Sequence, residues 1–125
     1  MRKPVDPNEL RAAVAAVLPW VRGETDEKPA RPVLAAAVRS SLRTLEQIAP
    51  GHSVEVRVPP FAAIQCVEGP RHTRGTPANV VEMDPRTWLE LAIGQMDWTT
   101  AVDQARVSAS GTRADISGLL PILRF

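Results

Sequence analysis

A change of hydrophobic period at Pro50-Gly51 constrains the fold more than any other feature of this sequence. Before this point apolar residues recur at the spacing of an α-helix, whereas residues 53–58 alternate apolar and polar side chains with the period of a β-strand. Proline followed by glycine is a frequent end of a helix. Helical and strand patterns in separate blocks are typical of the α+β class. The 125 residues fit one domain, so we expect a single domain over residues 1–125.

Two helices are predicted before the change of period. Asp6 followed by Pro7 is typical of a helix start, and apolar residues recur at helical spacing as far as Val21. Pro19 lies inside this pattern, and we expect it to end or kink the helix. A second helix is predicted from about residue 30 to about residue 49. Its apolar stripe consists of Leu34, Val38, Leu42 and Leu45.

Four strands are predicted after the change of period, over residues 53–58, 61–67, 78–83 and 107–110. The first two flank Pro59-Pro60 and are expected to pair as an antiparallel hairpin. Asp84 and Asp97 are typical helix caps, and they predict helices over residues 86–93 and from 98 to about 105. A last helix is predicted over residues 114–120.

Composition argues against several classes of function. Fifteen basic and fourteen acidic residues nearly cancel, and the five aromatic residues include no tyrosine, so we expect no nucleic-acid partner. Apolar runs stay well short of the ~20 residues that a membrane span needs, so we expect a cytoplasmic protein that is not transmembrane. A single cysteine, Cys66, and two histidines, His52 and His72, predict neither a disulfide nor a metal site, and we expect no cofactor.

The helix predicted over residues 86–93 is apolar on two sides. Trp88, Leu91 and Ala92 share one face, while Leu89, Ile93 and Met96 form another. One face can pack on a sheet, and the other must meet a helix, a partner chain or an apolar ligand. The C-terminal residues 116–125 are similarly rich in apolar side chains. A well-filled core closed by its own C-terminus is the simpler explanation of both features, although periodicity does not distinguish a packed core from a lined cavity.

The order of elements from residue 78 onward resembles the second half of sterol carrier protein domains. The residues that carry the resemblance are ANVVEMDPRTWLELAIGQMDWTTAVDQARVSASGTRADISGLL, with Leu-x-x-Gly at Leu91 to Gly94 and Val-x-x-x-Gly at Val107 to Gly111. The whole chain is most similar to the small stand-alone bacterial branch of that family. The family commonly has a glycine just before the strand at Val107, where this chain has Gln104-Ala105-Arg106.

The resemblance implies a mixed, mostly antiparallel sheet of about four or five strands covered by helices, here with two N-terminal helices. It also implies an apolar tunnel between sheet and helices for sterols, fatty acyl chains and similar lipids. The ligand-binding residues implied by the matching helix and the closing segment are Trp88, Leu91, Ala92, Ile93, Leu119, Leu120 and Leu123.

A polar loop over residues 68–77 is the second candidate site. It contains Arg71, His72 and Arg74, which could contact the anionic head group of a ligand, because arginine pairs well with oxyanions. A solvated polar loop explains the same residues without any ligand.

No catalytic constellation is evident, so the predicted function is the non-catalytic binding of an apolar or amphipathic small molecule: a lipid, a fatty acyl compound or a sterol-like ligand. The alternative is a protein-interaction or homodimer module that keeps the fold without a lipid cavity. An enzyme of unknown type that uses Arg71, His72 and Arg74 is a third hypothesis.

Overall fold

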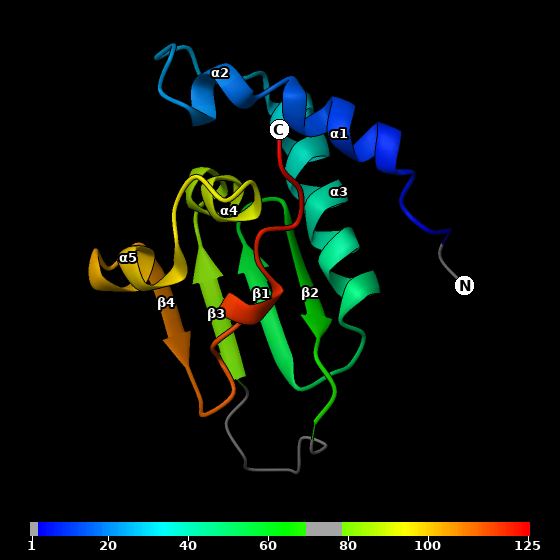
Figure 1. Cartoon of the computed structure of the whole chain (residues 1–125), viewed down its shortest axis with the longest axis vertical. Helices are drawn as coiled ribbons and strands as arrows, with labels where there is room; N and C mark the ends of the chain where they lie inside the picture. Colours follow the sequence, from blue (N-terminus) through cyan, green and yellow to red (C-terminus); the bar gives the residue numbers. More distant parts are fainter. Residues whose placement is uncertain (1–2, 70–78) are drawn as a thin grey trace.

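A four-stranded mixed sheet with helices on one face forms the centre of the molecule (Figure 1). The structure is a computed structural model, which describes residues 3–69 and 79–125. The strand order across the sheet is β2-β1-β3-β4. The strands are β1 (Val54–Val58), β2 (Ala62–Cys66), β3 (Asn79–Met83) and β4 (Val107–Ser110). The predicted α+β class and the strand positions are thereby confirmed.

The pairing of the strands is mostly antiparallel. The hairpin predicted across Pro59-Pro60 is confirmed, since β1 pairs antiparallel with β2, and Val56 lies opposite Ile64. β1 and β3 are parallel neighbours, and β3 and β4 are antiparallel. The parallel pair makes the sheet mixed, as the resemblance implied.

Three helices precede the sheet: α1 (Pro7–Ala15), α2 (Leu18–Val21) and α3 (Arg31–Ile48). The carboxylate of Asp6 accepts a hydrogen bond from the Asn8 amide and caps α1. The break expected from Pro19 is confirmed, although it does not fall at the proline itself: α1 ends at Ala15, four residues before Pro19, and α2 begins at Leu18. Pro19 instead lies in the first turn of α2, where its missing N–H leaves no helical hydrogen bond unmade.

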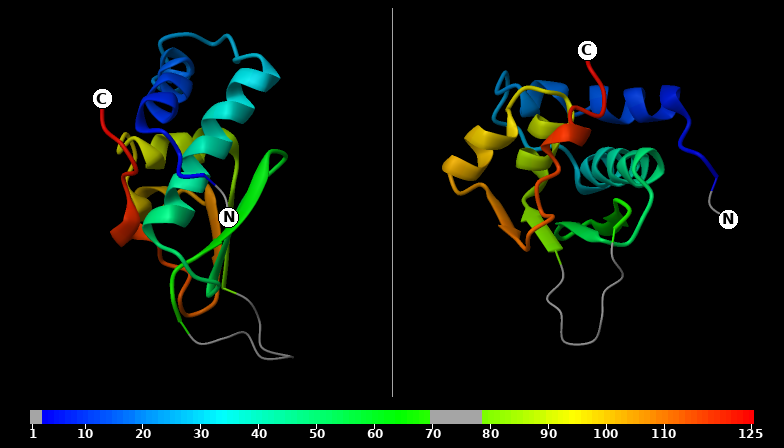
Figure 2. Two further views of the ribbon diagram at one scale, coloured as in Figure 1. Left: turned by 90° about the vertical axis from the view of Figure 1, so that its right-hand side faces the viewer. Right: turned by 60° about the horizontal axis from the view of Figure 1, so that its bottom comes forward.

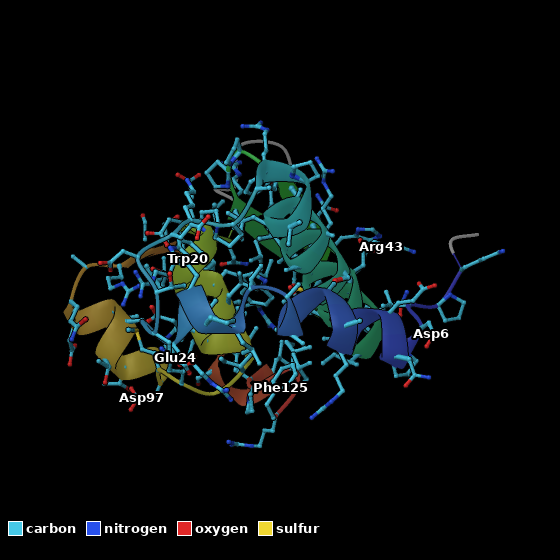
Figure 3. All side chains as sticks on the ribbon, turned by 90° about the horizontal axis from the view of Figure 1, so that it is seen from above. Asp6, Trp20, Glu24, Arg43, Asp97 and Phe125 are labelled. Atoms are coloured by element: carbon cyan, nitrogen blue, oxygen red, sulfur yellow. The ribbon has the colours of Figure 1, made fainter. Side chains whose placement is uncertain are left out.

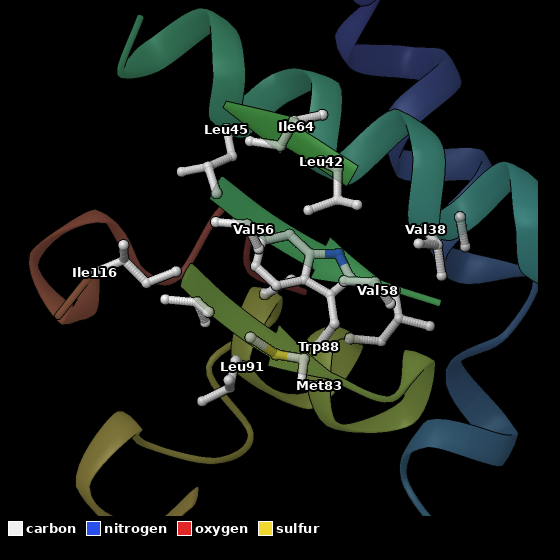
Figure 4. Packing of buried hydrophobic residues seen from close by; sticks show 14 of the residues in the cluster. Val38, Leu42, Leu45, Val56, Val58, Ile64, Met83, Trp88, Leu91 and Ile116 are labelled. Atoms are coloured by element: carbon white, nitrogen blue, oxygen red, sulfur yellow. The ribbon is translucent and has the colours of Figure 1, made fainter. Parts of the chain in front are cut away.

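The core lies between α3, α4 (Pro85–Ala92) and one face of the sheet. Alternation along β1 buries Val54, Val56 and Val58 on this face and leaves Arg57 exposed on the other. The predicted apolar stripe of α3 is fully buried against it. Figure 4 shows the Trp88 ring within this layer, close to Leu42, Val58 and Met83.

Aspartate caps begin both helices that follow β3. The Asp84 carboxylate accepts from the Thr87 amide at 2.7 Å and starts α4. The Asp97 carboxylate accepts from the Thr100 amide at 2.7 Å and starts α5 (Trp98–Asp103). None of the helices in the described ranges is long and apolar enough to cross a membrane.

The helix predicted over residues 114–120 is wrong, since only a 3-10 turn, η1 (Ser117–Leu119), forms there. The Asp115 carboxylate accepts a hydrogen bond from the Ser117 amide at 2.8 Å, and this local bond competes with a helix. Gly118 is a poor helix former, and Pro121 disfavours helical backbone at Leu120. The remaining residues run past α4 toward α1, as both views of Figure 2 show.

Candidate functional site

The C-terminal residues 115–125, which we call the strap, lie across the end of α4. The amides of Ile122 and Leu123 both donate to the carbonyl of Ala92, at 2.7 and 3.1 Å. At the far end, Arg11 of α1 donates through Nη1 to the Arg124 carbonyl at 3.0 Å, and its guanidinium lies 4.4 Å from the Phe125 ring centroid. Figure 3 shows Phe125 beside α1. The strap therefore joins α4 to α1.

A hollow of about 300 Å³ opens between the end of α4, the start of α5 and the strap. We call it the strap hollow. Its apolar lining combines Leu91 of α4, Met96 and Trp98 of the α4–α5 region and Leu120 of the strap, with Asp97 and Arg124 as charged residues. Its volume lies at the lower end of the range for small-molecule sites.

A second hollow of about 240 Å³ adjoins the first, and Arg124 lines both. Ile93 and Phe125 supply apolar surface to this second hollow, and Arg22 supplies another cation. The Arg124 guanidinium crosses Gly94, where an added Cβ would lie 3.1 Å from its Nη1 atom. Gly94 also has a φ of 77°, which favours glycine, so both space and backbone require this residue at the crossing.

Positive charge dominates the boundary between the two hollows. Within residues 3–69 and 79–125, the structure gives neither the Arg22 nor the Arg124 guanidinium a carboxylate at ion-pair distance. Asp97 is the acidic residue of the strap hollow, and its carboxylate is engaged as the cap of α5. Hydrogen bonds from Thr100 lower the Asp97 pKa, so this group is ionised at neutral pH. Among the residues that the structure describes, the two arginines therefore have no carboxylate partner.

The structure brings together three of the seven predicted ligand-binding residues around these hollows. Leu91 and Leu120 line the strap hollow, and Ile93 lines the second one. Leu119 and Leu123 are half-buried against the core. Trp88 and Ala92 are fully buried, and the Trp88 Nε1 donates to the Ser41 hydroxyl at 2.8 Å. These last two residues are part of the packed layer between sheet and helices.

Arg71, His72 and Arg74 lie outside the described residues, so the structure does not place the second candidate site. Sequence reasoning missed Arg22, Trp98 and Arg124 as pocket residues. Arg22 and Arg124 are far apart in the chain and belong to no motif, so no local signal could have joined them.

A metal centre and a reactive thiol have little support among the described residues. No group of three or more metal-ligating side chains occurs among the residues that the structure describes. Cys66 is buried, and burial raises its pKa to about 11, with a smaller contribution from Glu46. Its thiol is therefore neutral at physiological pH. The two hollows combine apolar side chains with polar groups and the guanidiniums of Arg22 and Arg124.

Comparison with known protein families gives one finding of direct relevance. A family model described as bacterial SCP ortholog matches residues 30–122, from the start of α3 into the strap. No curated protein matches the chain. The matched span includes the whole sheet, α4, α5 and the residues of the strap hollow up to Pro121.

Proposed function

Since the chain belongs to the bacterial SCP ortholog family, we propose that it binds an amphipathic lipid with an anionic head group and does not transform it. Membership of a sterol carrier protein family suggests lipid binding in general. The finer proposal, an anionic amphiphile at the strap, comes from the chemistry of the two hollows.

The observation that carries the proposal is the meeting of α4 and the strap around a hollow of mixed polar and apolar lining, with a cation at its edge. Met96, Trp98 and Leu120 come from three different segments and offer apolar surface to one space. Burial of each methylene group contributes about 0.8 kcal/mol, so a short stretch of acyl chain suffices for measurable affinity. The apolar wall accounts for a lipid tail.

Arg124 and Arg22 account for the head group. Both guanidiniums line the second hollow, and Arg124 reaches the first as well. Charge-assisted hydrogen bonds between guanidinium and carboxylate or phosphate oxygens are roughly twice as strong as neutral ones. An anionic head group at this boundary would satisfy two cations that have no carboxylate partner within the described part of the chain.

A longer ligand would need the strap to move. Trp88, Leu91 and Ala92 are at most 1% exposed, so the layer between sheet and helices is filled in this conformation. The strap is held to α4 by two amides that share the single carbonyl of Ala92. We propose that release of these two hydrogen bonds opens the tunnel between sheet and helices to the tail of a bound lipid.

Calorimetric titration with oleate and with oleyl alcohol tests the proposal, because the two probes share a tail and differ in charge. Arg124→Ala should weaken oleate binding by roughly tenfold, the equivalent of 1.4 kcal/mol, and leave oleyl alcohol unaffected. Arg57→Ala on the open face of the sheet is the matched control and should change neither titration. Equal losses for both probes would remove the head-group role, and absence of oleate binding would end the proposal.

A protein-interaction module is the second candidate function. The complete burial of Trp88 and Ala92 favours it, since both residues act as core in the present conformation. Under this alternative the protein keeps the family fold and binds neither oleate nor oleyl alcohol. The same titrations therefore separate the two candidates.

A further inference from the structure

The outer edge of the sheet at β2 carries backbone groups that no strand of the described residues pairs. β2 is the first strand in the order β2-β1-β3-β4, and its pairing partner is β1. Val58 and Ala62 are the last pair of the β1–β2 ladder, and Pro59 has no N–H, so this pair must exchange its own two hydrogen bonds. Ladder bonds alternate, so Ile64 also bonds to β1, while the amides and carbonyls of Ala63 and Gln65 point to the open edge.

β2 lacks two of the features that usually protect an edge strand, a charged side chain and a proline. The sequence of β2 is AAIQC. Two hollows, of about 470 and 450 Å³, lie along it, and both are lined by Ala63 and Ile64. α3 packs beside the strand, as Figure 1 shows, but the hollows leave space at the edge itself.

Charges of opposite sign mark the two ends of the edge. The hollow that reaches Ala62 is lined by Lys3, Arg39 and Arg43. The hollow that reaches Gln65 is lined by Glu46, His52 and Glu55, and Glu55 forms an ion pair with Arg57 at 2.7 Å. An antiparallel copy of β2 would run in the opposite direction along this edge. Its basic end would then lie beside the acidic end of the first copy, and its acidic end beside the basic end.

We propose that the occupant of this edge is a second copy of the same chain, joined through antiparallel pairing of β2 with β2. A two-fold axis at Ile64 reverses the second strand, so the basic end of each copy faces the acidic end of the other. Such self-complementarity is what a symmetric dimer interface requires. The two sheets then form one continuous sheet across the interface.

The register set by this axis is compatible with every side chain of the strand. Ile64 lies opposite Ile64 of the second copy on the core face, and Ala63 lies opposite Gln65 on the exposed face. No like charges meet on the paired strands, which would destabilise the pairing. On α3, Arg43 faces toward Glu46 of the second copy. The surface is separate from the strap hollow and independent of its ligand.

Sedimentation velocity from micromolar to millimolar protein tests the pairing with two matched double variants on the exposed face. Ala63→Glu with Gln65→Lys places opposite charges across the interface, and its dimer should persist. Ala63→Glu with Gln65→Glu places like charges there, and the dissociation constant should rise by about tenfold. Circular dichroism confirms that both variants fold. A monomer at all concentrations, or equal behaviour of the two variants, would overturn the proposal.

Amide hydrogen exchange locates the interface within the strand. Exchange at Ala63 and Gln65 should slow as protein concentration rises, because their amides become bonded only in the dimer. Ile64 is the internal control, since its amide bonds to β1 in both states. A dimer in which exchange at Ala63 and Gln65 does not depend on concentration would use another surface and would contradict the proposal.

Discussion

Trp88 is the largest of the fully buried side chains, and one hydroxyl group satisfies its only polar atom. Its Nε1 donates to the Ser41 Oγ at 2.8 Å, while that hydroxyl donates to the carbonyl of Ala37 at 2.6 Å. A buried N–H without an acceptor is unfavourable, so Ser41 determines where the indole can lie. The pair fixes α4 against α3.

Replacement of Ser41 tests this role. Ser41→Ala should lower the free energy of unfolding by about 1–3 kcal/mol, because it leaves the Trp88 N–H buried without an acceptor. Ser40→Ala is the control, since the Ser40 hydroxyl bonds to α3 carbonyls and not to Trp88. Urea denaturation measures both variants. Equal stabilities of the two would show that the Trp88 hydrogen bond contributes nothing.

Ala105 holds a backbone conformation that usually belongs to glycine. Its φ is 58°, its amide donates to the Val102 carbonyl, and the Arg106 amide donates to the Ala101 carbonyl. This is a Schellman ending of α5, in which glycine is the preferred residue. Gly94 occupies the equivalent position after α4, where the amides of Gly94 and Gln95 make the matching pair of bonds.

Ala105→Gly should therefore stabilise the protein by about 1 kcal/mol, because it relieves the left-handed strain of a residue with a Cβ. Ala36→Gly, at an exposed position inside α3, should lower stability by about 1 kcal/mol. Thermal unfolding should show a higher midpoint for Ala105→Gly and a lower midpoint for Ala36→Gly than for the unmodified protein. A loss of stability in Ala105→Gly would contradict the strain argument.

At the scale of elements, a partly buried ion pair joins α4 to the segment between α5 and β4. Glu90, which is 6% exposed, accepts from Arg106 Nη1 at 2.9 Å and from Nη2 at 3.3 Å. Arg106 also donates from Nε to the Thr87 hydroxyl at 3.1 Å. Arg86 approaches the same carboxylate at 3.2 Å. These contacts hold β4 and α5 in place relative to α4.

A double-mutant cycle measures this junction. Glu90→Gln and Arg106→Gln should show a coupling energy of about 1–3 kcal/mol in the free energy of unfolding. The exposed pair Glu55 and Arg57, at 2.7 Å, is the matched comparison and should give less than about 1 kcal/mol. Similar coupling in the two cycles would mean that burial adds nothing to the Glu90–Arg106 pair.

Most elements could be predicted because their signals are local. Alternation of apolar and polar residues predicted β1. Asp84 and Asp97 predicted the starts of α4 and α5, and each caps its helix by accepting from the amide three residues later. The segment after Gly111 was predicted wrongly because its apolar residues mimic a helix. The Asp115 side-chain bond, Gly118 and Pro121 together outweigh that pattern.

At the scale of the whole molecule, the site could be predicted only in part. The resemblance pointed to α4 and the closing segment, and Leu91 and Leu120 do meet there. The cations could not be foreseen, because Arg22 and Arg124 approach one hollow only through the path of the strap from α4 to α1. Whether an apolar residue lines a hollow or fills the core depends on packing, which periodicity does not report.

Native mass spectrometry of the freshly purified protein, with organic extraction of what accompanies it, tests the central claim most directly. The account predicts a lipid-sized adduct at one per chain, and the extract should contain an acidic amphiphile. Addition of oleate should displace that adduct. Protein without any adduct that also takes up no added oleate would contradict the account, and the apolar surface at the strap would then belong to the packed core.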